Sequence, residues 1–522
     1  MMTQQKCSAF VHKYSLLLFF ALCLFAFLIR VYDLSGTPAG MHADEASSAY
    51  NAYSLLKTGK DEHGVFLPLY FEAFNDYKHP FFIYSMIPSL FVFGLTNFGS
   101  RFTSVLFGMF GIILLYFIIS RLFGKNAALL SAFFLAIMPW HLHHSRVAFE
   151  VISFSFLFLF GLLCFYKGFE KKHWFFFSAI LFGISLYSYG IARLFIPLFL
   201  LGITWIYRTE LFTEKYRTTF FLCVFIFLTV AAASYYNSFF GHANARFAVV
   251  SIFYRTETPL TMFFLNYFSH FSPEYLFFSG DIQINNHITG WGQLPHYALL
   301  FVPLGILFLW KQRYRREAQM VLLWLLLFPV AASFTYGDLP HAARSFIGAP
   351  AFAIVMSLGL ISLFHIVDQN ALFRTRISSL SQSRIFSIFL MIIILIILLE
   401  TVFFLYSYFV IYRETSADYW LAFAPETAQY MESVRSMYDN IYLSKKGLDL
   451  FYISLLYYLN ADPAQYQSFG IESFGYQYCD MDTCINESQH NMYVFRGFEL
   501  TIKGTHNIYY TTNDKIAVKF FG

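Results

Sequence analysis

Two adjacent carboxylates, Asp44 and Glu45, stand in the stretch MHADEASSAY, shortly after the first apolar run of the chain. A carboxylate at such a place can act as a general base that removes a proton from an attacking group. Aspartate is also a good helix N-cap, so a plain alternative is that one acid caps a helix beginning at SSAYNAYSLL. Capping accounts for one of the two acids more readily than for both.

Further ionisable side chains recur beside apolar runs farther along the chain. They are His42, Lys78, His79, Arg101, His144, Arg146, Glu150, Arg193, His341 and Arg344. Each taken alone is typical of a helix end whose long side chain reaches the membrane interface. Together, carboxylates and cations at the same ends of several apolar runs predict a site for an anionic ligand at the membrane surface.

The composition identifies the kind of chain that must position these groups. Of 522 residues, 58% are hydrophobic and 13% are charged, whereas a soluble protein carries about 25% charged residues. Aromatic residues make up 22%, and 69 of them are Phe. This composition excludes an ordinary soluble globular protein and predicts a polytopic α-helical membrane protein.

Apolar runs long enough to cross about 30 Å of hydrocarbon predict about eleven membrane spans. The runs lie near 14–29, 101–122, 127–143, 150–166, 174–190, 191–207, 218–236, 296–310, 319–335, 346–366 and 385–411. A further run at 80–95 is shorter and contains Pro88. If 80–95 does not span, all basic clusters fall on one side, as the positive-inside rule requires. We therefore expect a re-entrant or interfacial helix at 80–95, a cytoplasmic N-terminus and an outer C-terminus.

The run at 14–29 has two interpretations, a secretory signal or a signal anchor. No small-x-small cleavage site follows Arg30, which favours an anchor. The remaining chain divides into a transmembrane catalytic domain, 1–412, with a long first outer loop at 33–100, and a small extracytoplasmic α+β domain at 413–522. Cys479 and Cys484, in YCDMDTC, could bind a metal, but two thiols without a His pair favour a disulfide in an oxidising compartment.

The order of several motifs resembles a known family. HADEASSAYNAYSLLKTG, then KHPFFIY, SRFTSV and PWHLHHSRVAFE, are similar to polytopic glycosyltransferases that use polyprenyl-phosphate sugars. These are the protein O-mannosyltransferase and aminoarabinose transferase group (glycosyltransferase family 39-like), which has the GT-C fold. The similarity runs over about the first 200 residues and continues more weakly through SGDIQINNHITGWG and LPHAARSF. No single motif decides it; their order and spacing do.

The resemblance implies roles for the polar residues. Asp44 would be the catalytic base with Glu45 as its companion, and Lys78 would bind the phosphate of the lipid-linked donor. Arg101 and Arg146 would be further phosphate partners. A single displacement without a covalent intermediate would invert the anomeric centre. The partners implied are a polyprenyl-phosphate sugar, membrane lipids and a protein, lipid or glycan acceptor, with no nucleic acid.

Two positions depart from the family pattern. His79 stands where relatives carry the first proline after the lysine, and Glu150 stands where they often carry Asp. Glu150 and His144 could hold a divalent metal ion, since carboxylate and imidazole are both metal ligands. The alternative, which we favour, is a set of interfacial histidines without metal.

Other functions with the same composition stay open. A transporter or flippase of lipid-linked sugars would place charges within its spans, and these spans carry few. A glycan polymerase or ligase of the same fold, or an inactive scaffold, are further alternatives. We expect a multi-pass protein of a bacterial or archaeal plasma membrane, with its active site outside.

Overall fold

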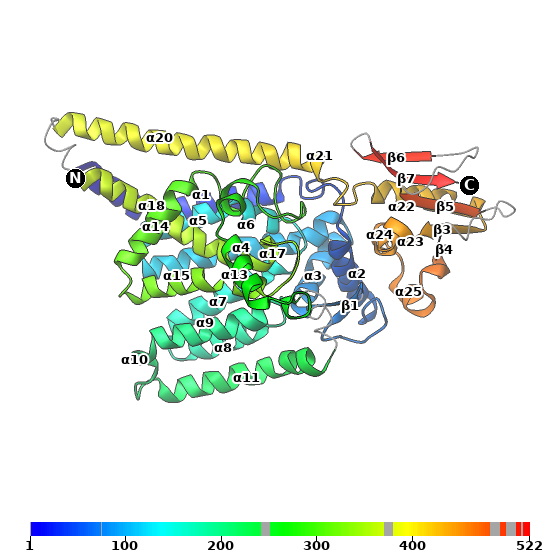
Figure 1. The fold of residues 1–522 in the computed structure, drawn as a ribbon, viewed down its shortest axis with the longest axis horizontal. Helices are drawn as coiled ribbons and strands as arrows, with labels where there is room; N and C mark the ends of the chain where they lie inside the picture. Colours follow the sequence, from blue (N-terminus) through cyan, green and yellow to red (C-terminus); the bar gives the residue numbers. More distant parts are fainter. Residues whose placement is uncertain are drawn as a thin grey trace. The chain divides into compact units, whose positions relative to one another are not determined.

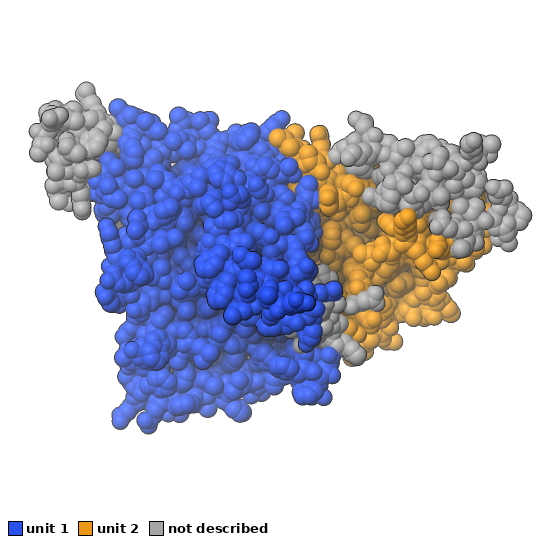
Figure 2. All heavy atoms as spheres, in the orientation of Figure 1, with its two compact units in different colours: residues 1–32, 104–146, 150–407 blue, residues 33–103, 147–149, 408–522 orange. Residues whose placement is uncertain are grey.

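The computed structural model describes residues 2–74, 76–241, 251–369, 379–480, 491–496, 508–512 and 515–521. The chain forms two compact units (Figure 2). Unit 1 comprises Met1–Tyr32, Ser104–Arg146 and Glu150–Ser407, and unit 2 comprises Asp33–Thr103, Val147–Phe149 and Tyr408–Gly522.

Unit 1 is helical (Figure 1). Its helices are α1 (Met2–Val31), most of α4 (Asn97–Leu122), α5 (Lys125–Ile137), α6 (Pro139–His144), α7 (Val151–Gly168), α8 (His173–Ser185), α9 (Ala192–Ile206), α10 (Arg208–Leu211), α11 (Arg217–Phe240), α13 (Pro259–Ser269), α14 (Ala298–Lys311), α15 (Arg316–Leu327), α16 (Val330–Ser333), α17 (Ala342–Ser345), α18 (Ala349–Gln369) and α20 (Ser379–Tyr406). Helices satisfy their own backbone polar groups, which a lipid environment requires. Small residues let some of them touch: a Cβ at Gly359 of α18 would clash with the Phe301 carbonyl of α14.

Seven helices among the described residues are long and apolar enough to cross a membrane. They are Tyr14–Val31, Asn97–Leu122, Val151–Gly168, Arg217–Phe240, Arg316–Ser333, Ala342–Val367 and Ser387–Thr415. Four shorter apolar helices, α5, α8, α9 and α14, coincide with predicted spans. Whether these four also cross the membrane stays a prediction, and so does the count of eleven.

Unit 2 combines the first predicted outer loop with the C-terminal part of the chain. The loop supplies α2 (Ala43–Thr58), β1 (Phe71–Ala73), β2 (Asp76–Lys78) and α3 (Pro80–Phe93). The C-terminal part supplies α21 (Arg413–Thr415), α22 (Ala424–Val434), β3 (Asn440–Ser444), α23 (Lys445–Leu448), α24 (Phe451–Tyr458), α25 (Pro463–Phe469), β4 (Tyr476–Cys479), β5 (Asn491–Arg496), β6 (Ile508–Thr512) and β7 (Lys515–Phe521). Helix α3 has 14 residues and is therefore about 21 Å long, which is shorter than the roughly 30 Å of hydrocarbon in a bilayer. Its interfacial placement stays a prediction.

The five C-terminal strands form one mixed sheet in the order β4-β3-β5-β7-β6. Strand β3 pairs parallel with β4 and β5, while β7 pairs antiparallel with β5 and β6. Buried apolar side chains of α22, β3 and α24, with others from β4 and β5, form a shared core. The sheet thereby gives α24 a rigid support.

Polar contacts join the C-terminal helices to the first loop within unit 2. Tyr50 of α2 donates from its hydroxyl to the Ala461 carbonyl (3.2 Å). Gln467 of α25 donates from Nε2 to Ser54 Oγ, one turn farther along α2 (2.9 Å). The predicted division at residues 412 and 413 separates a transmembrane domain from an extracytoplasmic domain. It stays a prediction.

One sequence prediction falls partly outside the described residues. Cys479 ends β4 and is disulfide-bonded, as expected for a domain in an oxidising compartment. Its predicted partner, Cys484, lies outside the described residues, so the pairing itself stays a prediction.

Candidate active site

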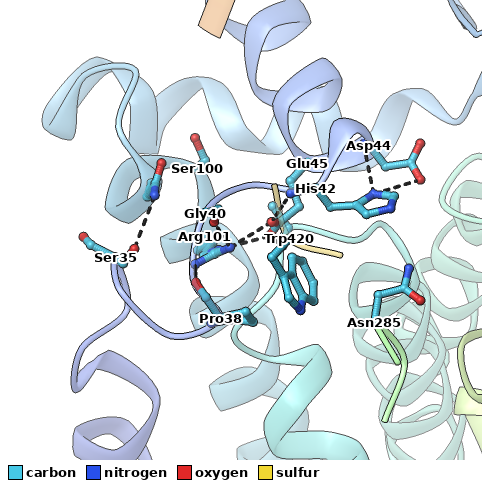
Figure 3. A network of polar contacts seen from close by, with 12 residues as sticks. Ser35, Pro38, Gly40, His42, Asp44, Glu45, Ser100, Arg101, Asn285 and Trp420 are labelled. Atoms are coloured by element: carbon cyan, nitrogen blue, oxygen red, sulfur yellow. Dashed lines mark hydrogen bonds and ion pairs between the residues drawn. The ribbon is translucent and has the colours of Figure 1, made fainter. Parts of the chain in front are cut away.

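Three polar residues, His42, Asp44 and Glu45, stand at the start of α2 (Figure 3). His42 is the N-cap: its Nδ1 accepts from the Asp44 backbone N–H (3.2 Å), while the Glu45 carboxylate accepts from the His42 N–H (3.2 Å). This reciprocal arrangement is a capping box. The helix therefore begins at Ala43, earlier than SSAYNAYSLL. The expected capping role belongs to His42 and Glu45, and the Asp44 side chain takes no part in it.

Glu45 is fully buried and held from three directions. Its carboxylate receives two parallel hydrogen bonds from Arg101, from Nε (3.0 Å) and Nη2 (2.9 Å). It also accepts from the Ala148 backbone N–H (2.6 Å). A buried charge is tolerated when it is paired and its lone pairs are satisfied. Glu45 therefore joins α2, the start of α4 and the segment 147–149 into one piece.

Arg101 has no N–H group left over in this arrangement. Besides its two bonds to Glu45, it donates to the carbonyls of Leu34, Pro38 and Gly40 at 2.7–3.2 Å. A guanidinium has five N–H donors, and all five are used. The geometry thus assigns Arg101 to holding the first loop, while its predicted contact with a phosphate stays a prediction.

Asp44 is the exposed partner of the pair. Its side chain is 51% exposed, and Oδ1 lies 3.0 Å from Lys78 Nζ, whereas Oδ2 lies 3.4 Å from His42 Nδ1. The surrounding protein tends to raise the pKa of Asp44, but the Lys78 ammonium and the His42 ring more than offset this. The pKa of Asp44 is therefore held well below its usual range, and the carboxylate is ionised at neutral pH.

Lys78 owes its position to a hairpin and a proline. It is the last residue of β2, paired with Phe71 of β1, and Pro80 then starts α3, where a proline is favoured. Its Nζ also donates to the Asp44 carbonyl (2.9 Å) and lies 5.4 Å from the centre of the Phe74 ring. The intervening His79 is buried, with its ring 5.8 Å from that of Tyr70. The replacement of a proline by His79 thus leaves Lys78 directed at Asp44.

An aromatic cluster that the sequence did not reveal lies beside His42. The His42 ring lies 5.7 Å from that of Phe149 and 6.0 Å from that of Trp420, and these two are stacked at 5.8 Å. Trp420 is fully buried and also lies 5.7 Å from the Arg101 guanidinium. Nothing in the sequence around Trp420 points to this place, because it is over 300 residues away from His42.

The other predicted site residues belong to unit 1. Arg146 is buried, with Nη1 at 2.7–3.0 Å from three carbonyl oxygens at the end of α1, those of Ile29, Arg30 and Tyr32. A cation stabilises the negative end of a helix in this way. The Arg193 carbonyl accepts from the Tyr235 hydroxyl (2.7 Å). These contacts are structural, and a role in ligand binding for either arginine stays a prediction.

His341 and Arg344 lie together in unit 1. The N-cap of α17 is His341, whose Nδ1 lies 3.5 Å from the buried Asp281 carboxylate. Asp281 also accepts from the Ala342 N–H (2.6 Å). Arg344 donates from Nη1 to Thr335 Oγ1 (2.9 Å). Asp281 was not singled out from the sequence, because it lies in a polar loop away from the apolar runs.

The two residues expected to bind a metal lie at helix ends, His144 as the last residue of α6 and Glu150 just before α7. His144 donates from Nδ1 to the Trp140 carbonyl (3.0 Å), and Glu150 is the N-cap of α7. Among the described residues, no group of three or more His, Cys, Asp or Glu could hold a metal ion. Metal binding by Glu150 and His144 stays a prediction.

Part of the chain is similar in sequence to a known family. Residues 78–236 match the family model described as dolichyl-phosphate-mannose-protein mannosyltransferase. An uncharacterized protein of Aquifex aeolicus (strain VF5) is 29% identical over 168 residues, which cover 32% of this chain and 33% of that protein. The predicted resemblance to this group is thereby confirmed over that segment.

Solved structures match nearly the whole chain. ArnT from Cupriavidus metallidurans, bound to undecaprenyl phosphate, is 16% identical with a TM-score of 0.55 and covers 97% of both chains; its apo form gives 0.54. The oligosaccharyltransferase AglB from Archaeoglobus fulgidus, in complex with an inhibitory peptide and a dolichol-phosphate, is 12% identical with a TM-score of 0.54, covering 93% of this chain and 70% of that one. This chain is a multi-pass membrane protein with the GT-C fold of these proteins.

Proposed function

We propose that this protein is a glycosyltransferase that moves a sugar from a polyprenyl-phosphate donor to an acceptor hydroxyl on the outer face of the plasma membrane. The observation that carries the proposal is the contact between Asp44 and Lys78, 3.0 Å apart at the exposed start of α2. A carboxylate that can take a proton thus stands beside a cation that can bind a phosphate. The ligands bound to two structural relatives, undecaprenyl phosphate and dolichol-phosphate, support a donor of this class.

The transfer needs one base and one cation. The acceptor oxygen forms a bond to C1 of the sugar while the bond from C1 to the phosphate oxygen breaks. Asp44 takes the hydroxyl proton, and Lys78 stabilises the negative charge that the leaving polyprenyl phosphate acquires. One displacement gives inversion at C1. Polyprenyl phosphate is already a good leaving group, so no acid is required.

The ion pair between Asp44 and Lys78 provides a means of activating the base. While Lys78 contacts the carboxylate, the low pKa of Asp44 makes it a weak base. A donor phosphate that draws Lys78 away removes the main charge that stabilises ionised Asp44, so the pKa of Asp44 rises toward the working pH. A base is most effective when its pKa lies near that pH. Donor binding would therefore prepare Asp44 for proton transfer.

The experiment uses membranes from cells that make the wild-type protein, Asp44→Asn or Glu72→Gln. Glu72 is an exposed carboxylate on β1 and serves as the matched control. A panel of radiolabelled polyprenyl-phosphate sugars is added to each membrane preparation. The release of polyprenyl phosphate and the appearance of label in new products are then measured. We expect release with the wild type and Glu72→Gln, and loss with Asp44→Asn at equal protein levels.

The products also separate the alternatives. Equal release from the wild type and Asp44→Asn would remove Asp44 as the base. A single added sugar would support the proposed reaction, whereas transfer of a whole glycan would support a polymerase or ligase of the same fold. Movement of a donor across the membrane without release of polyprenyl phosphate would support a flippase instead.

A further inference from the structure

A second carboxylate in unit 2, Glu62, is buried and only half satisfied. Its side chain is 1% exposed. Its Oε1 accepts from Asn51 Nδ2 (2.8 Å), and its backbone N–H donates to Asn51 Oδ1 (3.0 Å). The second oxygen, Oε2, is buried and has no hydrogen-bond partner among the described residues. Buried polar atoms are seldom left in this state, so Oε2 retains a free acceptor position that a bound group can use.

Two tyrosines from the C-terminal helices accompany Glu62. Tyr452 of α24 and Tyr466 of α25 are half-buried, and both are near enough for the charge of Glu62 to act on them: after burial, it is the largest cause that raises the pKa of either phenol. Within the described part of the chain, neither hydroxyl has a hydrogen-bond partner. Tyr50 differs, because its hydroxyl donates a hydrogen bond to the Ala461 carbonyl.

The Glu62 group is continuous with the Asp44 site. Asn51, which holds Glu62, follows Asp44 by seven residues on α2, which is two turns along the same face and about 10 Å. Ser47 lies between them on that face, and its buried hydroxyl also lacks a partner in the part of the chain that the structure describes. The Phe74 ring lies 5.4 Å from Lys78 Nζ and 6.2 Å from the Tyr452 ring.

The chemistry of these groups selects the kind of ligand. Burial raises the pKa of Glu62 to about 7, so at neutral pH its carboxyl can donate or accept a hydrogen bond. Phenol hydroxyls also do both. A carboxyl and two phenols carry no positive charge, and phosphate is bound by cations, so these three groups do not favour a phosphate. Paired donors and acceptors of this kind match the hydroxyl groups of a saccharide.

We propose that Glu62, Tyr452 and Tyr466 form a binding site for saccharide hydroxyls beside the Asp44–Lys78 pair. The inference rests on the proposed transferase function for its place in the reaction, since the saccharide is either the donor sugar or the acceptor glycan. It also gives the C-terminal helices a role, because two of the three side chains come from α24 and α25.

The test measures saccharide binding without requiring turnover. The full chain is placed in lipid nanodiscs and exposed to a panel of methyl glycosides of neutral and amino sugars, with binding followed by saturation-transfer NMR. We expect a signal with the wild type that becomes about tenfold weaker in Glu62→Gln, Tyr452→Phe and Tyr466→Phe, the loss of one good hydrogen bond each. Tyr50→Phe is the matched control and should retain the signal.

Asp44→Asn separates this inference from the proposed function, because it should bind the same glycoside while losing turnover. No signal from any glycoside with the wild type, or equal signals from all variants, would overturn the inference and leave the function to the turnover assay. The turnover assay then identifies the saccharide. A raised KM for the donor in Tyr466→Phe assigns the contact to the donor sugar, whereas less labelled product at an unchanged donor KM assigns it to the acceptor.

Discussion

Glu45 and Arg101 form a fully buried ion pair with two parallel hydrogen bonds, at 3.0 and 2.9 Å, at the start of α2. Asp44, the preceding residue, is 51% exposed. The two neighbouring acids therefore have different roles. Glu45 holds the first turn of α2 in place, and the Asp44 side chain is exposed at that turn. This division is the reason that the two adjacent carboxylates give different predictions on substitution.

Glu45→Ala should lower the stability of the folded protein far more than Asp44→Asn. Removing one partner of a buried ion pair leaves the other charge uncompensated, which costs about 3–5 kcal/mol. Loss of the Asp44 charge costs less, because its side chain is half-exposed and water screens its contact with Lys78. Thermal unfolding in detergent should show a large loss of Tm for Glu45→Ala and a smaller loss for Asp44→Asn. Equal Tm values for the two variants would contradict the anchoring role of Glu45.

Asp44 and Lys78 should contribute stability that disappears in acid. The pKa of Asp44 is lower in the folded protein than in the unfolded chain, where it is about 3.9. Its contribution is therefore complete above the unfolded pKa and is lost as the pH falls below about 4. The Tm of the wild type should drop more steeply than that of Asp44→Asn between pH 5 and pH 3. Parallel pH profiles would argue against the contact.

Lys78→Ala should impair donor use more than Lys78→Arg. A phosphate requires a positive charge at this place, which Arg supplies and Ala does not. We expect Lys78→Ala to raise the donor KM by about tenfold or more, the loss of one charge-assisted hydrogen bond. Lys78→Arg should retain part of the affinity. The release assay with the donor panel measures the donor KM of both variants. An unchanged donor KM in Lys78→Ala would remove Lys78 from phosphate binding.

Glu62 has the opposite pH dependence to Asp44. Burial raises its pKa to about 7 from an ordinary value of 4.5, so the folded protein keeps a proton that the unfolded chain releases between these two pH values. Stability from the protonated carboxyl is complete below the lower value and is lost as the pH rises through 7, on the order of 3 kcal/mol. Glu62→Gln should therefore raise Tm relative to the wild type at pH 8 and much less at pH 5. A Tm difference that does not vary with pH would show that Glu62 stays ionised.

The sequence predicted the parts of the site that lie close together in the chain. Asp44 and Lys78 were identified because they are charged residues beside apolar runs, and the structure brings them into contact. The separate roles of Glu45 and Arg101 were missed, since burial of a charge cannot be read from a motif. Tyr452, Tyr466 and Trp420 were missed for another reason. Each of them contacts a residue of the first loop that lies more than 300 positions earlier in the sequence. No local sequence pattern indicates such a contact.

Arg146 offers a test of a phosphate role against a structural one. Its Nη1 lies at 2.7–3.0 Å from the carbonyls of Ile29, Arg30 and Tyr32, where a planar, permanently charged group can serve several acceptors and a single ammonium fits less well. We expect both Arg146→Ala and Arg146→Lys to lower Tm, with the larger loss for Ala. The donor KM of the folded fraction of Arg146→Lys should equal that of the wild type.

The reverse result would restore the role that the sequence suggested for Arg146. An unchanged Tm with a raised donor KM in Arg146→Lys would mean that the guanidinium contacts the donor phosphate during the reaction and that its contacts at the end of α1 are dispensable. A loss of Tm together with an unchanged KM would instead assign Arg146 to the helix end, and Lys78 would then carry the phosphate without Arg146. Thermal unfolding and the release assay on the same preparation distinguish the two cases.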